Sequence, residues 1–414
     1  MRILLCCEFY APSVGGVQEV IKQIAERLVL RGHEVTVATT KLPTRKFNTL
    51  NGVNIVDFKI SGNLVNGIIG EVEAYRNFVL SGNFDAIMVK AAQQWTFDAL
   101  WEILPQIKMR KVFIPCGFSG LYEPEYTDYF NKLPAILSQF DHLIFYASDY
   151  RDINFAREHG LDGLSVIPNG VSEKEFLVEP DPDFRARHGI DPDDFLMLTV
   201  GSFTGMKGQF EVTSAFAKMK NDKSATLIIN GNRIPRITKP ALKSIAKKHA
   251  RGMLQMLGLK EKPNTWMDLA ESVNKEKENK RVIITDLPRS ELVQAFMAAD
   301  LFVFASNIEY SPLVLFEAAA AGTPFLSGPV GNAEEIASWT GAGVICPAQR
   351  DERGYTRVDP TVLAEYMSEL ASDKSHLSQL GAAGRKSWLE RFTWDKIVIE
   401  YEKVLRDPDE LKSL

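Results

Sequence analysis

The chain has 414 residues, of which 45% are hydrophobic and 24% charged, and this length and composition predict two globular domains rather than a disordered chain. Its formal net charge of −5 argues against a nucleic-acid-binding protein that depends on a large basic surface. Its four cysteines, two of them adjacent at Cys6 and Cys7, form neither a disulfide framework nor a metal-spaced cluster, so we expect a reducing, cytoplasmic environment.

The first half of the chain alternates short apolar runs with helical patterns, which is typical of a parallel sheet covered by helices. Residues 2–7 predict a buried strand, which is too short and too soon acidic for a signal sequence. Apolar residues at helical spacing follow from Val17 to Leu28, and Gly32 ends that helix. Further strands are expected at 34–39, 55–58, 86–89, 111–114, 142–146 and 165–167. Together these elements predict one Rossmann-like unit.

Between residues 172 and 194 the composition shifts to Glu, Asp and Pro, with only a short helical stretch at 184–188. Such a segment predicts an interdomain linker. A second series of strands, turns and helices begins with a strand at 195–200 and continues to about residue 390. We therefore interpret the chain as an α/β protein with one domain at residues 1–180 and another at 190–391. No apolar run approaches the ~18 residues of a membrane-spanning helix, so we expect a soluble or peripheral protein.

A basic segment interrupts the second half. Residues 233–251 contain seven lysines and arginines and no acidic residue. Lys239, Lys243 and Lys247 are spaced four apart and share one face of a predicted helix. A solvated face is the usual role of such a pattern. The alternative is contact with an anionic membrane or an acidic acceptor.

Each predicted domain has a glycine turn between a strand and a helix. In the first, Gly15 and Gly16 would let a phosphate approach backbone N–H groups. Loop glycines most often serve only turns, but this position in a Rossmann-like unit favours ligand binding. In the second, Lys207 stands between Gly205 and Gly208 and brings a cation to a helix start. This turn is not an ATPase phosphate loop, because Gly208 replaces the hydroxyl residue that would bind magnesium.

A short helix after residue 310 is well delimited. Ser311 is predicted as its N-cap, Pro312 as its first residue, and Gly322 as its end. The next amides, on Leu313 and Val314, would point out of the positive end of the helix dipole, where an anion is favoured.

Glu309 and Glu317 lie eight residues apart around the start of this helix. Alone, the pair is most simply an acid near a helix dipole and a solvated side chain, although two carboxylates beside an anion site also suit a nucleotide sugar. The segment resembles the paired-glutamate motif of family 4 retaining glycosyltransferases, which have the GT-B fold. Residues 281–306, 166–171 and 201–208 and the N-terminus extend the resemblance in the same order.

This resemblance implies two Rossmann-like domains facing across a cleft, with a last helix at about 392–414 crossing back to the first domain. It implies a retaining, metal-independent transferase of polysaccharide biosynthesis, without a cofactor, that acts in the cytoplasm or at the inner membrane face. The donor would be a nucleotide diphosphate sugar, and the acceptor a glycan, a lipid-linked molecule or a small molecule. The alternatives are a non-catalytic sugar-nucleotide-binding subunit and another GT-B enzyme, such as an epimerase or a phosphorylase.

The resemblance also assigns roles to the residues near the paired glutamates. Lys207 would bind the diphosphate and support the leaving group. Glu309 would bind hydroxyls of the donor sugar, and Glu317 those of the ribose. The amides of Leu313 and Val314 would bind the distal phosphate.

Two positions depart from the family pattern. Ser202 stands where many members have an arginine that binds the diphosphate. Cys116 stands where many have a histidine near the reacting carbon, and its thiol cannot simply replace the imidazole in proton transfer. We therefore assign no general base.

Asp286 and Leu287 lie where the family lines the pocket for the nucleotide base, although both also suit an ordinary strand end.

Overall fold

The computed structural model describes residues 1–221, 223–232 and 265–406. The basic face of Lys239, Lys243 and Lys247 lies outside these residues. Among the described residues, no helix combines the length and the apolar character needed to cross a bilayer.

The chain divides into two compact units. Unit 1 comprises Met1–Lys174, Tyr310–Phe316 and the C-terminal part from Trp388; unit 2 comprises Glu175–Glu309 and Glu317–Ser387. The first division therefore falls between residues 174 and 175, before the 180–190 boundary expected from composition. A short segment of the second half, 310–316, also belongs to unit 1. Contacts formed by that segment cannot be inferred from composition, which explains the difference.

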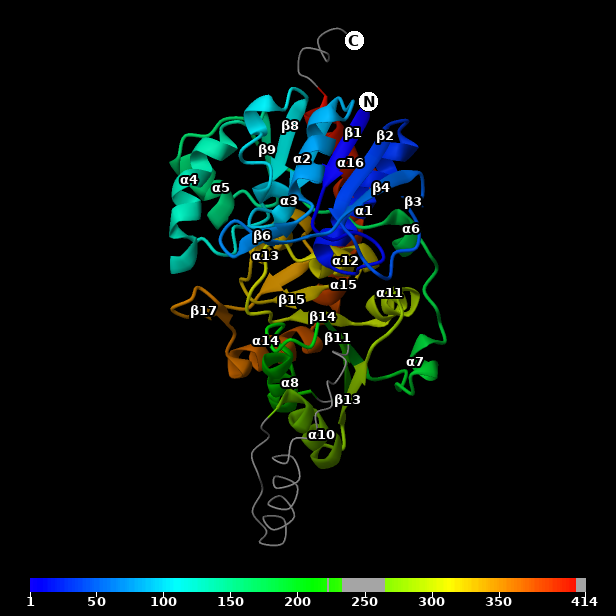
Figure 1. Cartoon of the computed structure of the whole chain (residues 1–414). Helices are drawn as coiled ribbons and strands as arrows, with labels where there is room; N and C mark the ends of the chain where they lie inside the picture. The colour runs from blue at the N-terminus through cyan, green and yellow to red at the C-terminus, as the bar shows by residue number, and fades with distance from the viewer. Residues whose placement is uncertain (222, 233–264, 407–414) are drawn as a thin grey trace, which may run out of the picture. The chain divides into compact units, whose positions relative to one another are not determined.

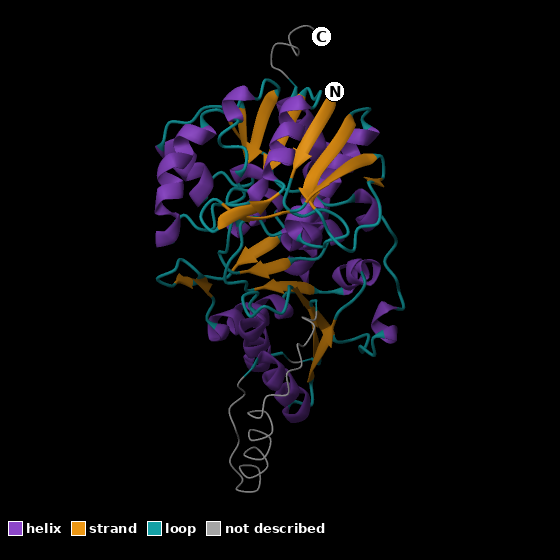
Figure 2. Ribbon diagram, in the orientation of Figure 1, coloured by secondary structure: helices purple, strands orange, loops and turns teal. Residues whose placement is uncertain are grey.

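Unit 1 contains an eight-stranded sheet with strand order β10-β9-β8-β7-β1-β2-β4-β3. Figure 2 draws the strands in orange and the helices in purple. All its pairs are parallel except β3 with β4. The strands are β1 (Arg2–Cys6), β2 (Glu34–Thr40), β3 (Thr49–Leu50), β4 (Val53–Phe58), β7 (Ala86–Lys90), β8 (Arg110–Ile114), β9 (His142–Phe145) and β10 (Leu164–Val166). Strands β5 (Ile60–Asn63) and β6 (Gly67–Gly70) form a separate antiparallel pair.

Both faces of the unit 1 sheet are buried. Ile3 and Leu5 of β1 belong to one apolar cluster, and Leu4 and Cys6 to another, because successive side chains of a strand point to opposite faces. The helices of this unit are α1 (Gly16–Leu30), α2 (Val72–Ser81), α3 (Trp95–Asp98), α4 (Thr127–Leu137), α5 (Arg151–Glu158) and α16 (Trp394–Leu405). A parallel sheet with helices on both faces is buried throughout, which explains the apolar runs in the sequence.

Unit 2 contains a six-stranded parallel sheet with strand order β13-β12-β11-β14-β15-β16. The strands are β11 (Phe195–Val200), β12 (Ala225–Asn230), β13 (Lys280–Thr285), β14 (Leu301–Phe304), β15 (Phe325–Ser327) and β16 (Gly343–Ile345). The helices are α7 (Phe184–Arg187), α8 (Gln209–Lys218), α10 (Trp266–Glu276), α11 (Arg289–Ala298), α13 (Ala333–Thr340), α14 (Pro360–Ser372) and α15 (Lys374–Ser387). Helices α6 (Glu173–Phe176) and α12 (Leu313–Ala321) each contain residues of both units.

The C-terminal helix belongs to unit 1, where α16, red in Figure 1, packs against α1. Its Trp394 and Tyr401 share an apolar cluster with Ile21 of α1. The amide of Val171 donates to the carbonyl of Phe392 at 2.9 Å, and the amide of Trp394 donates to the carbonyl of Val171 at 3.2 Å. These bonds separate α16, which begins at Trp394, from the preceding helical residues.

Candidate active site

Two loops of unit 2 lie side by side after neighbouring strands. One follows β11 and carries Lys207, and the other follows β14 and carries Glu309. The amide of Asn307 donates to the carbonyl of Met206 at 2.9 Å. Gly208 has φ +72°, and a Cβ there would collide with a backbone carbonyl, so the close approach of the loops requires glycine. The carboxyl edge of a parallel sheet is the usual ligand edge of such folds.

Lys207 and Glu309 form an ion pair at this edge. The Nζ atom of Lys207 donates to Oε1 of Glu309 at 2.5 Å, and the hydroxyl of Ser306 donates to the same oxygen at 3.0 Å. The side chains of Lys207 and Glu309 are 28% and 17% exposed, so both are partly buried. An ammonium has three donors, so Lys207 can hold the carboxylate and still donate to a phosphate oxygen.

The backbone around Ser202 is held by a residue that the sequence analysis did not single out. Gln209 is buried, and its Nε2 atom donates to the carbonyls of Gly201 and Ser202 at 3.2 and 3.1 Å. A Cβ on Gly201 would lie only 2.8 Å from Cβ of Lys207. The turn therefore packs the Cβ end of the Lys207 side chain against Gly201.

Glu317 is paired as well. Its Oε1 atom lies 2.6 Å from Nη2 of Arg289, the first residue of α11, and its side chain is 13% exposed. The solvated role considered for Glu317 is therefore wrong. Arg289 also donates from Nε and Nη2 to Glu175 at 2.9 Å each. Burial alone would lower the pKa of Arg289, but the carboxylates of Glu317 and Glu175 outweigh that effect and raise it. Sequence reasoning missed Arg289 and Glu175, because nothing near them in the chain indicates this contact.

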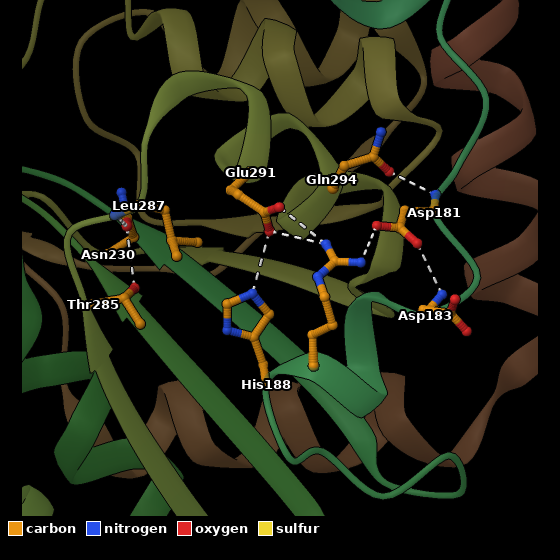
Figure 3. A network of polar contacts seen from close by, with 9 residues as sticks. Asp181, Asp183, His188, Asn230, Thr285, Leu287, Glu291 and Gln294 are labelled. Atoms are coloured by element: carbon orange, nitrogen blue, oxygen red, sulfur yellow. Dashed lines mark hydrogen bonds and ion pairs between the residues drawn. The ribbon is translucent and has the colours of Figure 1, made fainter.

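The end of β13 carries the two residues expected near a nucleotide base. The amide of Leu287 donates to Oδ1 of Asn230 at 2.8 Å, and the hydroxyl of Thr285 donates to the same oxygen at 3.1 Å (Figure 3). Asn230 is buried at the end of β12 and thus fixes the backbone of Leu287. Asp286 is exposed. Their contact with a base stays a prediction.

The start of α12 lies among the residues of unit 1. The helix begins at Leu313, so the prediction of Pro312 as its first residue is wrong by one position. Nδ2 of Asn169 donates to the hydroxyl and carbonyl oxygens of Ser311 at 3.1 and 3.2 Å. Asn169 therefore fixes the entry to the helix, whose first amides, on Leu313 and Val314, have no acceptor within the helix.

The end of α12 agrees with the prediction. Gly322 has φ +76°, and the amide of Thr323 donates to the carbonyl of Ala318 at 2.9 Å. A left-handed glycine with this hydrogen bond is a common C-terminal cap.

The glycine turn of unit 1 lies beside the start of α12. Helix α1 begins at Gly16, and the amide of Glu19 donates to the carbonyl of Gly15 at 2.9 Å. A Cβ on Gly16 would lie 3.7 Å from Cδ1 of Leu313. The structure thus places one predicted phosphate-binding turn near the predicted phosphate-binding helix start.

Cys116 lies in an unusual loop after β8. Cys116, Gly117 and Phe118 have φ values of +66°, +90° and +47°, a conformation that costs energy for residues other than glycine. The amide of Gly117 donates to Oδ2 of the buried Asp152 at 2.8 Å, and burial raises the pKa of Asp152 to about 6. Burial also raises the pKa of the Cys116 thiol. The thiol is therefore protonated at neutral pH, in keeping with the absence of an assigned base.

A buried lysine ends the neighbouring strand β7. Lys90 is 1% exposed, and its Nζ atom donates to the hydroxyl of Tyr146 at 2.6 Å. Burial lowers the pKa of Lys90 to about 8, and nearby Cys116 and Cys7 oppose that shift. No carboxylate forms an ion pair with Lys90 in the part of the chain that the structure describes. Within the same part, no group of three or more His, Cys, Asp and Glu residues is placed to hold a metal ion.

Comparison with known proteins gives the family. A family model described as "Glycosyl transferases group 1" matches residues 180–387, and a model described as "Glycosyltransferase Family 4" matches residues 14–175. The chain belongs to the group 1 glycosyltransferases. This glycosyltransferase is therefore an enzyme that transfers glycosyl groups.

One relative matches this glycosyltransferase along nearly its whole length. It is 22% identical over 412 residues to N-acetyl-alpha-D-glucosaminyl L-malate synthase of Bacillus anthracis, with 96% of this chain and 95% of the relative covered.

Solved structures show the fold. Sucrose-phosphate synthase from Thermosynechococcus elongatus matches with a TM-score of 0.72 at 20% identity and covers 100% of this chain and 99% of its own. HepE from Anabaena, solved in complex with UDP and glucose, matches with a TM-score of 0.64 at 16% identity and full coverage of both chains. The fold of this glycosyltransferase is GT-B, as the sequence analysis expected.

Proposed function

We propose that this enzyme transfers a sugar from a nucleotide diphosphate sugar with retention of the anomeric configuration and without a metal ion. The observation that carries the proposal is the Lys207–Glu309 pair, 2.5 Å apart at the carboxyl edge of the unit 2 sheet. It joins a cation suited to a diphosphate with a carboxylate suited to sugar hydroxyls. These are the two groups that meet in a nucleotide diphosphate sugar.

The other predicted residues extend this donor site. Glu317 would accept hydrogen bonds from the ribose hydroxyls, and Leu287 and Asp286 would contact the base. The amides of Leu313 and Val314 would donate to the distal phosphate, because a helix N-terminus favours an anion. The HepE structures, which hold UDP and UDP-glucose, support a nucleotide sugar as the donor.

Transfer would proceed at one face of the sugar. The bond between the anomeric carbon and the diphosphate oxygen breaks, and negative charge develops on the departing diphosphate. Lys207 and the helix amides stabilise that charge more than they stabilise the bound donor, which lowers the barrier. The acceptor hydroxyl forms its new bond on the same face and gives its proton to a phosphate oxygen of the leaving group. This route needs no protein base, in keeping with a protonated Cys116.

Positive charge at the diphosphate would come from Lys207 and the helix dipole instead of a divalent cation. Ser202 contributes no charge, so the ammonium of Lys207 carries more of this task than it would beside an arginine. The enzyme should therefore depend strongly on Lys207.

The acceptor is a glycan, a lipid-linked molecule or a small molecule. A lipid-linked acceptor would suit an enzyme held at an anionic membrane by Lys239, Lys243 and Lys247. Sedimentation with anionic liposomes, compared between the wild type and a variant with glutamate at all three positions, tests this membrane contact. Equal sedimentation at low salt would contradict it.

Donor binding and stereochemistry test the proposal directly. Thermal unfolding with UDP-, GDP- and ADP-sugars should identify the donor, because a ligand at a hundred times its Kd stabilises by ~2.7 kcal/mol. Proton NMR of the product, with that donor and a panel of acceptors, should show the anomeric configuration of the donor. Inversion, or no binding of any nucleotide sugar, would refute the proposal.

A further inference from the structure

Arg289 joins residues of three helices at the carboxylate expected to bind ribose, and all three residues belong to unit 2. It is the first residue of α11, and its guanidinium lies 2.6 Å from Glu317 of α12 and 2.9 Å from Glu175 of α6. The contact with Glu175 uses two donors and both carboxylate oxygens. A planar guanidinium held in this way has one orientation, so it fixes the direction from which it contacts Glu317.

The position of Arg289 is electrostatically unusual. A helix N-terminus carries partial positive charge, so an arginine at the first residue of α11 is unfavourable there on its own. Two carboxylates offset both positive charges. Removing Arg289 would leave Glu175 and Glu317 as two negative groups without their shared cation.

Glu317 keeps acceptor capacity while paired with Arg289. An ionised carboxylate can accept about four hydrogen bonds. Arg289 contacts Oε1 of Glu317 at 2.6 Å. The remaining lone pairs are enough for two neighbouring hydroxyls. The arginine can therefore stay in place while a vicinal diol binds.

We propose that Arg289 is a positioning residue for the donor, which orients the Glu317 carboxylate so that it accepts hydrogen bonds from both ribose hydroxyls. This inference rests on the proposed function, in which Glu317 binds the ribose. Arg289 acts through Glu317 and need not touch the donor itself. Its effect should therefore appear as selectivity for ribose over deoxyribose.

A merely structural role would give a different result. If Arg289 only fastened α6 to α11 and α12, its loss would lower the melting temperature and weaken every nucleotide equally. A positioning role affects the affinity of the ribonucleotide and leaves that of the 2′-deoxy form nearly unchanged. The ratio of the two dissociation constants separates these roles.

The experiment measures Kd by calorimetry for UDP, GDP and ADP and for their 2′-deoxy forms. The variants are R289Q and R289K, with R187Q as the matched control. Arg187 is 43% exposed against 42% for Arg289 and also contacts two carboxylates, Asp181 and Glu291. Figure 3 shows the carboxylate of Glu291 bonded to His188 and that of Asp181 bonded to the amide of Asp183. The amide of Asp181 donates to Oε1 of Gln294.

We expect the wild type to bind its preferred ribonucleotide about tenfold or more tighter than the deoxy form, as a hydrogen bond to a charged group predicts. R289Q should lose most of this ratio, R289K should regain part of it, and R187Q should keep it. In turnover assays R289Q should raise KM for the donor and leave kcat close to that of the wild type.

Each contrary result has its own meaning. An unchanged ratio in a folded R289Q would overturn the role of Arg289, as would equal weakening of both nucleotides. If R289Q does not fold, R289K provides the test. An R289K variant with the wild-type ratio of dissociation constants and the wild-type melting temperature would show that residue 289 only maintains the fold, and this would overturn the inference. If the wild type binds nucleotides without preferring ribose, Glu317 does not bind the ribose hydroxyls, and the inference is also overturned. A wild type that binds no nucleotide would instead refute the proposed function.

Discussion

The carboxyl edges of the two sheets differ in chemistry. At the edge of unit 2, Lys207 and Glu309 are ion-paired and partly exposed. At the edge of unit 1, Lys90 and Asp152 are buried, and burial shifts the pKa of each toward its neutral form. Charges that remain near solvent can bind a charged ligand, whereas buried groups with shifted pKa values hold a loop in shape. In the proposed function, the ionic contacts to the donor therefore come from unit 2.

Removing the Lys207 cation of unit 2 should have the largest effect on activity and is the strongest test of this comparison. Lys207→Ala should lower kcat by ~10² or more, as expected for the loss of one preorganised donor to developing charge. The unfolding free energy should fall by only about 1 kcal/mol, because a partly exposed ion pair contributes little. Steady-state kinetics and urea denaturation measure both.

Lys218→Ala is the matched control for that experiment. Lys218 is on the following helix and contacts Thr361 at 2.9 Å, away from Glu309. It should have wild-type kcat. Wild-type turnover in the Lys207 variant would remove Lys207 from the mechanism.

The two glutamates should separate by role. Glu309→Gln should lower kcat about 10- to 100-fold, because the lost charge contacts both the sugar and Lys207. Glu317→Gln should mainly raise KM for the donor, because its contact with ribose is equal in the bound and transition states. Initial rates over a range of donor concentrations distinguish the two. The reverse assignment of effects would exchange their proposed positions along the donor.

The buried lysine of unit 1 should affect stability instead of turnover. The pKa of Lys90 in the folded protein is about 8, below the ordinary lysine value of 10.5. Between these values the unfolded chain binds more protons than the folded chain, so the Lys90 contribution to stability rises with pH from about 8 to 10.5. Lys90→Met should lack this rise. Urea denaturation at intervals across this range tests it, and parallel curves for the two proteins would contradict the lowered pKa.

The smallest expected effect is that of metal removal. EDTA should leave the activity of the wild type unchanged, because Lys207 and a helix N-terminus supply the positive charge in the proposed mechanism. Activity after chelation and after added manganese measures this. Loss of activity that manganese restores would require a metal ion at the diphosphate.

Long-range contacts account for most of what sequence reasoning missed. Asn230 binds Leu287, 57 residues later, and Asn169 binds Ser311, 142 residues later. The residues next to each asparagine in the sequence do not indicate its hydrogen-bond partner. The same holds for Arg289 and Glu317, which lie on α11 and α12, the helices before and after β14.

The sequence by itself determined the parallel strands of the unit 1 sheet, the glycine turns, and the paired glutamates near a helix start, but not β3 or the β5–β6 pair. These features depend on local spacing: apolar runs predict buried strands, and a glycine predicts a helix end at Gly322. Only the tertiary structure decided which cation pairs with which glutamate, how far Lys207 is buried, and that burial shifts the pKa values of Lys90 and Asp152. Those properties arise from residues that folding brings together across long stretches of chain, and local spacing carries no information about them.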